Sequence, residues 1–322
     1  MKLLVTGGAG FIGSNFINHI LTTYPEYEIV NLDALTYAGD KNSLLTWEKD
    51  KRYEFVQGNI CDRALVDALL ERCDIIVHFA AETHVDRSIL DAKSFIETNI
   101  MGTFTLLESA RAHGNKRVHH ISTDEVFGSL GENDVPFDEL TPYDPRSPYS
   151  ASKASGDHLV MAYHHTYGLP VTISNCSNNY GPFHFPEKLF PLAITNLLEN
   201  KKVPVYGDGL QVRDWLYVED HCKAIDLIIH KGKIGEKYCV GGNHEIKNID
   251  AVKKIISILG KDESNIEYVD DRPGHDRRYA ISNNKIIREL GWKPETTFDE
   301  GLRKTISWYQ ENEAWWKSKK KI

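Results

Sequence analysis

Residues 2–21 read KLLVTGGAGFIGSNFINHIL, and this stretch decides the fold. Its pattern is that of a strand, a glycine turn and a helix, with Gly7, Gly10 and Gly13 in the turn. Backbone amides at the start of such a helix, together with the helix dipole, suit a pyrophosphate. Glycines at these positions let the backbone come close to the ligand. Taken alone, the pattern leaves a plain strand-turn-helix connection open.

The segments that follow alternate between strand and helix patterns. Strands are predicted at 28–35, 53–60, 73–83, 117–122 and 169–176, and helices at 62–72, 94–114 and 149–168. This alternation predicts an α/β fold, a Rossmann-like doubly wound parallel sheet that binds ligands at the carboxyl ends of its strands. From about residue 178 the pattern loosens, which predicts a smaller mixed α/β C-terminal domain. We expect a Rossmann domain over 1–177 plus about 212–241, and a second domain over 178–211 plus 242–322.

An acidic residue, Asp33, stands at the end of the second predicted strand, about 20 residues after the glycine turn. An acid at that place binds the ribose 2′-hydroxyl of a dinucleotide. The same carboxylate would repel the additional 2′-phosphate of NADP. The Rossmann domain is therefore predicted to bind NAD.

The composition is that of an ordinary globular protein, with 41% hydrophobic and 26% charged residues among 322. The net charge is 38 − 46 = −8, which argues against a general binder of nucleic acids or membrane surfaces. The five cysteines include no CxxC pair, and neither a signal peptide nor a membrane-spanning run is expected, so we predict a cytoplasmic protein. His84 and His164-His165 lack metal-ligand spacing, so no metal is expected. The Lys319-Lys320-Lys321 run is expected to be a solvated end.

The stretch YSASK places Tyr149 and Lys153 four residues apart, on one face of a predicted helix. A free tyrosine has a pKa of about 10, too high for a base at neutral pH. A neighbouring ammonium and an oxidised nicotinamide both favour the phenolate. Such a tyrosine can take a proton from a sugar hydroxyl while a hydride leaves for NAD. The alternative is a surface tyrosine beside a solvated lysine.

The stretch RVHHISTDEVFG, residues 117–128, places two acids, Asp124 and Glu125, where an apolar strand ends. The carboxyl end of a parallel sheet is where ligands bind, and two carboxyl groups in different environments can hold opposite protonation states. Thr123 precedes the pair. The other interpretation is an exposed turn or a helix N-cap.

Several motifs together resemble a known family. The TGGAGFIG turn with YSASK is similar to the extended short-chain dehydrogenase/reductase family, whose members modify nucleotide sugars. The triplet TDE narrows the resemblance to the nucleotide-sugar 4,6-dehydratases. The same branch is indicated by LTYAG (35–39), AAETHVDRS (80–88), SNNYGPFHFPEKL (177–189) and RPGHDRRY (272–279). The resemblance covers nearly the whole chain.

The resemblance implies an NAD-dependent lyase whose substrate is dTDP-glucose. The sugar is transiently oxidised at C4, water is eliminated across C5 and C6, and the hydride returns to C6. Glu125 would take the C5 proton, Asp124 would protonate the C6 hydroxyl, and Thr123 would bond to the C4 oxygen beside Tyr149. The alternatives are a UDP- or CDP-glucose 4,6-dehydratase, a nucleotide-sugar 4-epimerase and, outside the enzymes, an NAD-sensing regulatory protein.

The resemblance also implies ligand contacts, residue by residue. The cofactor positions are Gly7, Gly10, Phe11, Ile12, Gly13, Asp33, Leu35, Thr36, Asn59, Ile60, Ala80, Ala81, Thr83, Thr98, Tyr149, Lys153 and Asn179. The nucleotide-sugar positions are His84, Thr123, Asp124, Glu125, Asn178, Lys188, Leu189, Pro204, Tyr206, Arg213, Asn248, Arg272 and His275. Arginine forks suit the diphosphate oxygens, and Tyr206 would stack on the base.

The sequence departs from the family at a few positions. Asn59 stands for a usual Asp, Thr83 for Ser, Phe127 for Tyr and Asn175 for Arg. The amide oxygen of Asn59 can still accept a hydrogen bond from adenine. The helices at 94–112 and 149–167 match the pair that forms a four-helix bundle between family subunits, so a homodimer is expected.

Overall fold

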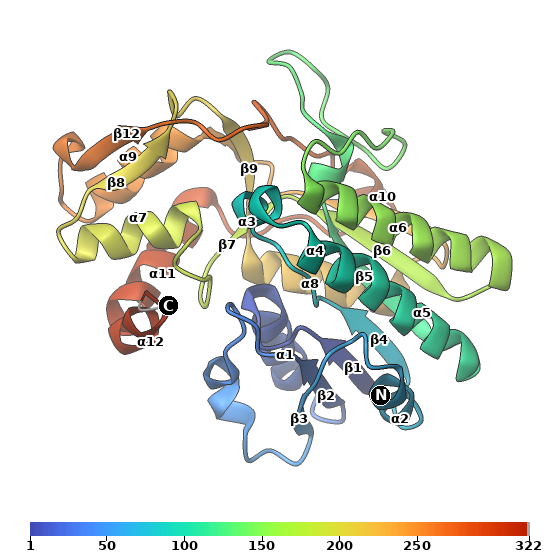
Figure 1. Ribbon diagram of the computed structural model, residues 1–322. Coiled ribbons are helices and arrows are strands. Elements are labelled where there is room, and N and C mark those ends of the chain that lie inside the picture. Colours follow the sequence, from blue (N-terminus) through green and yellow to red (C-terminus); the bar gives the residue numbers. More distant parts are fainter. Residues whose placement is uncertain (321–322) are drawn as a thin grey trace.

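A seven-stranded parallel sheet forms the centre of the computed structural model, which describes residues 1–320 (Figure 1). The strand order is β10-β6-β5-β4-β1-β2-β3, which is doubly wound and confirms the predicted fold class. The strands are β1 (Lys2–Thr6), β2 (Glu28–Asp33), β3 (Tyr53–Gln57), β4 (Ile75–His78), β5 (Arg117–Thr123), β6 (Val171–Cys176) and β10 (Glu236–Val240).

Helices cover both faces of this sheet because its strands are apolar on both sides. One face packs on α1 (Phe11–Thr23) and α8 (Val218–Lys231). The other packs on α2 (Arg63–Leu70), α5 (Thr103–Ala112) and α6 (Pro148–Tyr167). Val5 of β1 lies in the first core and Leu4 in the second, both without exposed surface.

The long helix predicted at 94–114 is broken. It consists of α4 (Lys93–Phe95), a π-helical stretch over Ile96–Gly102 and then α5. Inside the π-helical stretch, the Asn99 side chain bonds to both backbone groups of Glu82, accepting from its N–H at 2.9 Å and donating to its carbonyl at 3.0 Å. Such stretches often mark functional sites, and this one fixes the loop that follows β4.

Most of the remaining elements build the C-terminal part. A three-stranded sheet joins β7 (Asn178–Tyr180), β9 (Val212–Tyr217) and β11 (Glu245–Lys247), and a parallel pair joins β8 (Val203–Tyr206) and β12 (Ile266–Val269). The helices are α7 (Leu189–Leu198), α9 (Asn248–Ile258), α10 (Asn284–Leu290), α11 (Phe298–Glu311) and α12 (Glu313–Lys319). In Figure 1, β8, β12, α7, α9, α11 and α12 lie at the left, whereas α10 packs beside β10 and α8. Short elements are η1 (Lys41–Trp47), α3 (Val85–Leu90), η3 (Asp124–Phe127) and η4 (Glu263–Asn265).

The predicted division into two domains stays a proposal. Within the segment 212–241, α8 and β10 pack with the large sheet, whereas β9 pairs with β7 and β11. Of the helices within residues 1–320, none combines the length and the apolar character needed to cross a bilayer.

The sequence predicted that the C-terminal lysines form a solvated end, and this prediction is wrong for Lys319 and Lys320. Lys319 Nζ lies 2.9 Å from the buried carboxylate of Asp40, and Lys320 Nζ lies 3.0 Å from Glu199. Their side chains are mostly covered, because α12 packs back onto the body of the protein. Lys321 lies outside the described residues.

Candidate active site

One cavity of about 640 Å³ opens at the carboxyl ends of the central strands. Residues that follow β1, β2, β4 and β5 line one side, and residues of β8, β9 and the loop before α10 line the other. Of the residues predicted to bind cofactor or substrate, all line this cavity except Leu35 and Asp124. Leu35 has a left-handed backbone (φ 52°) and uses its amide to hold Asp33, while its neighbours Ala34 and Thr36 face the cavity.

The backbone of the glycine turn is packed so closely that Gly7 and Gly13 cannot carry a side chain. A Cβ on Gly7 would lie 2.5 Å from the Ala80 nitrogen, and one on Gly13 would lie 2.4 Å from the Gly7 oxygen. The Asp33 carboxylate accepts hydrogen bonds from the Ala9 amide at 2.9 Å and the Leu35 amide at 2.8 Å. These bonds aim the carboxylate into the cavity at the end of β2, so the residues present fit NAD.

Tyr149 and Lys153 lie on one face of α6, which begins at a capping box of Ser147 and Ser150. Lys153 Nζ donates to the Ile121 carbonyl at 2.8 Å, which fixes it against the end of β5. Burial and the charge of Glu125 raise the pKa of Tyr149, while a hydrogen bond with Thr123 lowers it. The net shift of the Tyr149 pKa is upward, opposite to the direction expected from a neighbouring lysine.

The acid pair forms the first turn of η3. The alternative of an exposed turn or an N-cap at these acids is wrong, because Asp124 is buried and the N-cap is Thr123. The Thr123 hydroxyl accepts from the Glu125 amide at 3.2 Å, which caps this turn. Glu125 lines the cavity, whereas Asp124 is 1% exposed and lies behind the wall. The two neighbouring acids therefore occupy different environments.

Their protonation follows from those environments. Burial, and then the charge of Glu125, raise the pKa of Asp124 well above its ordinary value. Burial also raises the pKa of Glu125, but Arg272 and Lys188 hold it down in part. The upward pKa shift is therefore stronger for Asp124 than for Glu125, and such a difference suits one acid and one base.

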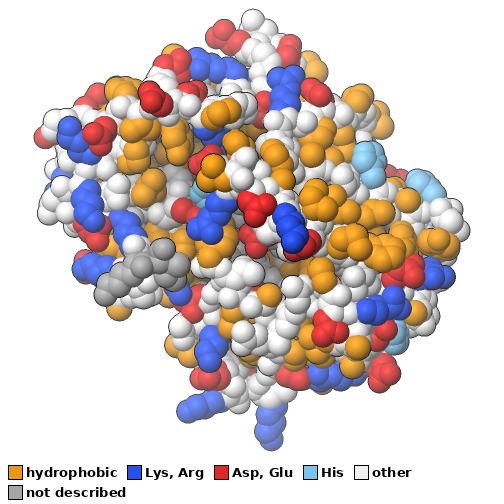
Figure 2. Space-filling model, viewed as in Figure 1, with side chains coloured by type: hydrophobic (Ala, Val, Ile, Leu, Met, Phe, Trp, Pro, Cys, Tyr) orange, Lys and Arg blue, Asp and Glu red, His pale blue; other side chains and the backbone are white. Residues whose placement is uncertain are grey.

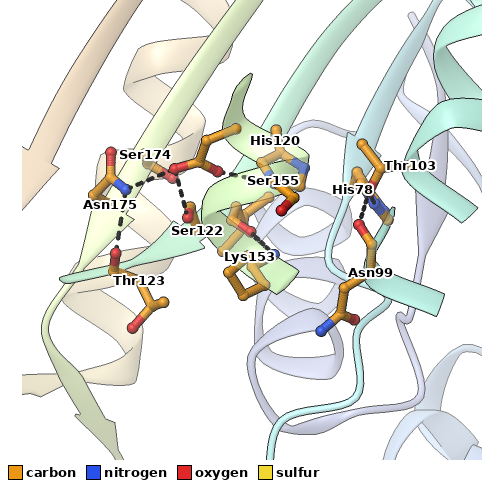
Figure 3. Close-up of polar contacts among 12 residues, drawn as sticks. His78, Asn99, Thr103, His120, Ser122, Thr123, Lys153, Ser155, Ser174 and Asn175 are labelled. Carbon is orange, nitrogen blue, oxygen red and sulfur yellow. Dashed lines mark hydrogen bonds and ion pairs between the residues drawn. The ribbon is translucent and has the colours of Figure 1, made fainter. Parts of the chain in front are cut away.

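A buried polar network lies behind Thr123 (Figure 3). Asp157 Oδ2 accepts from Ser122 at 2.9 Å, Tyr143 at 2.8 Å and Asn175 at 3.1 Å. Asn175 also donates to the Thr123 carbonyl at 3.2 Å. The network therefore fixes the strand end that carries Thr123.

Basic side chains converge on the half of the cavity formed by the C-terminal part. Arg213 is held by the carbonyls of Val212 and Asp276, and its guanidinium lies 4.3 Å from the centre of the Tyr279 ring. Arg272 Nη1 donates to Asp86 at 3.2 Å, and Lys188 Nζ donates to the Thr83 carbonyl at 3.1 Å. A diphosphate is the anion that this set of fixed donors suits.

Comparison with known proteins agrees with this geometry. The model of the GDP-mannose 4,6 dehydratase family matches residues 4–305. The chain is 52% identical to dTDP-glucose 4,6-dehydratase of Neisseria meningitidis over 98% of this chain and 95% of that one. It is 53% identical to the Escherichia coli protein of the same name, over 98% and 94%.

The chain belongs to the dTDP-glucose 4,6-dehydratase family. Among solved structures it is similar to DesIV of Streptomyces venezuelae, a dTDP-glucose 4,6-dehydratase crystallised with NAD and dTDP. The two share 49% identity and a TM-score of 0.97, over 99% of this chain and 100% of that one. A UDP-glucose 4-epimerase of Thermotoga maritima shares the fold at 28% identity and a TM-score of 0.89, covering 97% and 99%.

The contacts that surround Glu187, a residue of the cavity lining, were not predicted from the sequence. Tyr37 donates to Glu187 at 2.9 Å, and Arg87 lies 3.7 Å from the centre of the Tyr37 ring. These contacts join the loop after β2 to the segment before α7. The residues fall inside stretches that carry the dTDP-glucose 4,6-dehydratase resemblance, but a local pattern does not pair positions 150 residues apart. Within residues 1–320, no group of three or more His, Cys, Asp or Glu is arranged to hold a metal.

Proposed function

We propose that the chain converts dTDP-glucose to dTDP-4-keto-6-deoxyglucose and water, a step of deoxysugar biosynthesis. The observation that carries the proposal is that Tyr149, Lys153 and Glu125 line one cavity, with Asp124 buried behind its wall. Its relatives bear the name of this activity at about half sequence identity over nearly their full length. Bound NAD supplies a hydride acceptor that can give the hydride back.

The first proton is taken from the sugar C4 hydroxyl by Tyr149 Oη. Lys153 is held near this group and, as an ammonium, favours the phenolate. The Thr123 hydroxyl lines the cavity beside Tyr149, where it can hydrogen-bond to the C4 oxygen. Loss of the proton and hydride makes C4 a ketone, which acidifies the proton on C5.

Elimination of water then uses the acid pair. Glu125 takes the C5 proton, and its raised pKa strengthens it as a base. Asp124 gives its proton to the departing C6 oxygen. Because Asp124 lies behind the cavity wall, its carboxyl must turn toward the sugar to do so. Glu125 lines the cavity, so its carboxyl exchanges its proton with solvent, and it delivers a proton to C5 when the hydride has returned to C6.

The nucleotide is held by the C-terminal part. Arg213, Arg272 and Lys188 would bind the diphosphate, and Tyr206, which is 44% exposed at the cavity rim, would stack on the thymine. Tyr206 and Arg272 both donate hydrogen bonds to Asp86, at 3.4 and 3.2 Å. The substrate diphosphate must therefore compete with Asp86 for Arg272.

A double variant tests the reaction type. Asp124→Asn with Glu125→Gln keeps the size of both side chains and removes both proton-transfer groups. The dehydratase should lose water elimination, whereas a 4-epimerase would keep its activity. The wild-type protein should convert dTDP-glucose faster than UDP- or CDP-glucose, and equal or reversed rates would contradict the proposed substrate.

The oligomer is a second part of the proposal. Exposed apolar side chains gather over α3 to α5, as Figure 2 shows, and include Leu90, Ile96, Met101 and Phe104. We propose that this face and α6 pair with a second copy in a four-helix bundle. Sedimentation of the wild type as a monomer at micromolar concentration would contradict this. The five cysteines carry free thiols, which supports the proposed location in the reducing cytoplasm.

A further inference from the structure

One short segment, residues 182–188, connects the C-terminal part to the loops that hold the cofactor. It belongs to the connection between β7 and α7 (Figure 1), and we call it the strap. Four of its residues line the cavity, namely His184, Phe185, Glu187 and Lys188. The strap therefore forms part of the wall of the space in which NAD binds.

The first contacts of the strap are with α1, the helix that begins at the glycine turn. The His184 ring stacks on Phe11, the first residue of this helix, with ring centres 4.2 Å apart and planes 10° apart. One turn later, Asn15 Nδ2 donates to the Pro182 carbonyl at 3.0 Å. Because the N-terminus of this helix is the place for the pyrophosphate, the strap lies beside the phosphates of the cofactor.

The strap is next bonded to the loop after β2. Tyr37 Oη donates to Glu187 Oε1 at 2.9 Å, and the Tyr37 ring meets Phe185 edge-on, with ring centres 5.5 Å apart. Burial and the charge of Glu187 raise the pKa of Tyr37, so its hydroxyl remains a donor. Thr36 lines the cavity, whereas its neighbour Tyr37 does not. The Tyr37 hydroxyl therefore binds the strap and not the cofactor.

The loop after β4 gives the third attachment. His84 Nε2 lies 3.5 Å and Arg87 Nη2 lies 3.7 Å from Glu187 Oε2. Lys188 Nζ donates to the Thr83 carbonyl at 3.1 Å. The Glu187 carboxylate, which is 16% exposed, thus joins the strap to the loops after β2 and β4.

Helix α11 fixes the shape of the strap. Phe183 has a left-handed backbone (φ 65°), which is uncommon for a residue with a side chain. Its ring packs against Trp308, with ring centres 4.8 Å apart, and the Tyr309 hydroxyl donates to the His184 carbonyl. Neither of these α11 residues lines the cavity, so they hold the strap from the side away from NAD.

We propose that the strap keeps NAD bound between turnovers and that the bond from Tyr37 to Glu187 locks it. The cofactor site lies at the ends of β1, β2 and β4, and the strap is attached to the segments that follow all three strands. For NAD to leave, the strap must open. The use of such a lock rests on the proposed function, in which the hydride returns and NAD ends each turnover unchanged.

Exchange of the cofactor tests the lock. Holoenzyme loaded with deuterated NAD is mixed with excess unlabelled NAD, without any sugar nucleotide. The bound label is then followed by rapid gel filtration and mass spectrometry. Tyr37→Phe keeps the ring and removes the hydroxyl. Its release of NAD should be on the order of tenfold faster than in wild type, the effect of one lost hydrogen bond to a charged group.

Tyr24→Phe is the matched control. Tyr24 also donates to a carboxylate, that of Asp226 at 3.0 Å, but neither residue lines the cavity. This variant should release NAD at the wild-type rate. An equal acceleration in Tyr24→Phe, or a wild-type rate in Tyr37→Phe, would overturn the lock.

Glu187→Gln provides a second measurement on the same bond. An amide oxygen accepts from Tyr37 more weakly than a carboxylate does, so release should again be faster than in wild type. Because both changes weaken one bond, the double variant should accelerate release by less than the product of the two single effects. Acceleration by the full product would contradict the lock. Failure of the proposed function is read separately, because this assay contains no substrate and does not depend on loss of water.

Discussion

The buried carboxylate of Asp157 should stabilise the site, and Asp157→Asn measures how much. The residue is 1% exposed, two turns along α6 from Tyr149. Its Oδ2 accepts from three donors, and His120 Nε2 lies 3.3 Å from Oδ1. An amide oxygen has two lone pairs, so at least one of the three donors loses its partner in the variant.

The magnitude follows from these contacts. A hydrogen bond to a charged group contributes about 1.5–3 kcal/mol, and a neutral one about 1 kcal/mol. Replacing three charged bonds by two neutral ones, offset in part by no longer burying a charge, predicts a loss of about 3 kcal/mol in unfolding free energy. Lys153 also loses a nearby negative charge that supports its ammonium form.

The loss should depend on pH in a defined direction. Burial opposes ionisation of Asp157, but the nearby His120 and Lys153, together with the Tyr143 hydroxyl, bring its pKa below the ordinary value. A depressed pKa contributes stability above the unfolded value of about 3.9, and this contribution disappears as pH falls through the folded pKa. The deficit of Asp157→Asn should therefore shrink in acid.

Urea unfolding near neutral pH and in acid provides the assay. Glu132→Gln is the matched control, since this exposed loop carboxylate should change stability by less than about 0.5 kcal/mol. A variant at Asp157 as stable as wild type near neutral pH would refute the reasoning. An equal deficit at both pH values would refute the assigned charge.

Three further results are expected. Gly13→Ala should lose bound NAD, measured as the cofactor-to-protein ratio after gel filtration, because its Cβ would lie 2.4 Å from the Gly7 oxygen; Gly114→Ala, with no atom within 4 Å, should keep it. Asp124→Asn should have a higher melting temperature than wild type near neutral pH and lose that advantage in acid. The reason is that burial raises the pKa of Asp124, so that its ionisation opposes folding above the unfolded pKa of about 3.9. Calorimetry that shows no pH dependence of the difference would count against this. Asn59→Asp should bind NAD about fivefold more tightly in calorimetric titration, since a charged acceptor adds about 1 kcal/mol over a neutral one; weaker binding would contradict the adenine contact.

The sequence was sufficient for the central sheet because its signals are local. The apolar runs at β1, β4 and β5 and the glycine turn each specify their own element. Parallel strands then bring their carboxyl ends together, so the side chains that follow them had to meet in one place. Most residues of the site are therefore predictable from the order of strands and motifs along the sequence.

The remainder depends on contacts between distant segments. The π-helical stretch contains Asn99, which accepts a hydrogen bond from the Glu82 amide in the loop after β4. A helical sequence pattern does not reveal this contact. The turn of Asp124 away from the cavity depends on the packing behind β5, and the Lys319–Asp40 contact on how α12 returns. The upward pKa shift of Tyr149 arises from burial, which spacing alone does not measure.

The most direct test of the central claim is to incubate the protein with NAD and dTDP-glucose in deuterated water and follow the product by mass spectrometry and NMR. The account predicts loss of one water and gain of one deuterium at C5, because Glu125 returns a proton drawn from solvent. A product of unchanged mass, or a dehydrated product without deuterium at C5, would contradict the roles given to Asp124 and Glu125.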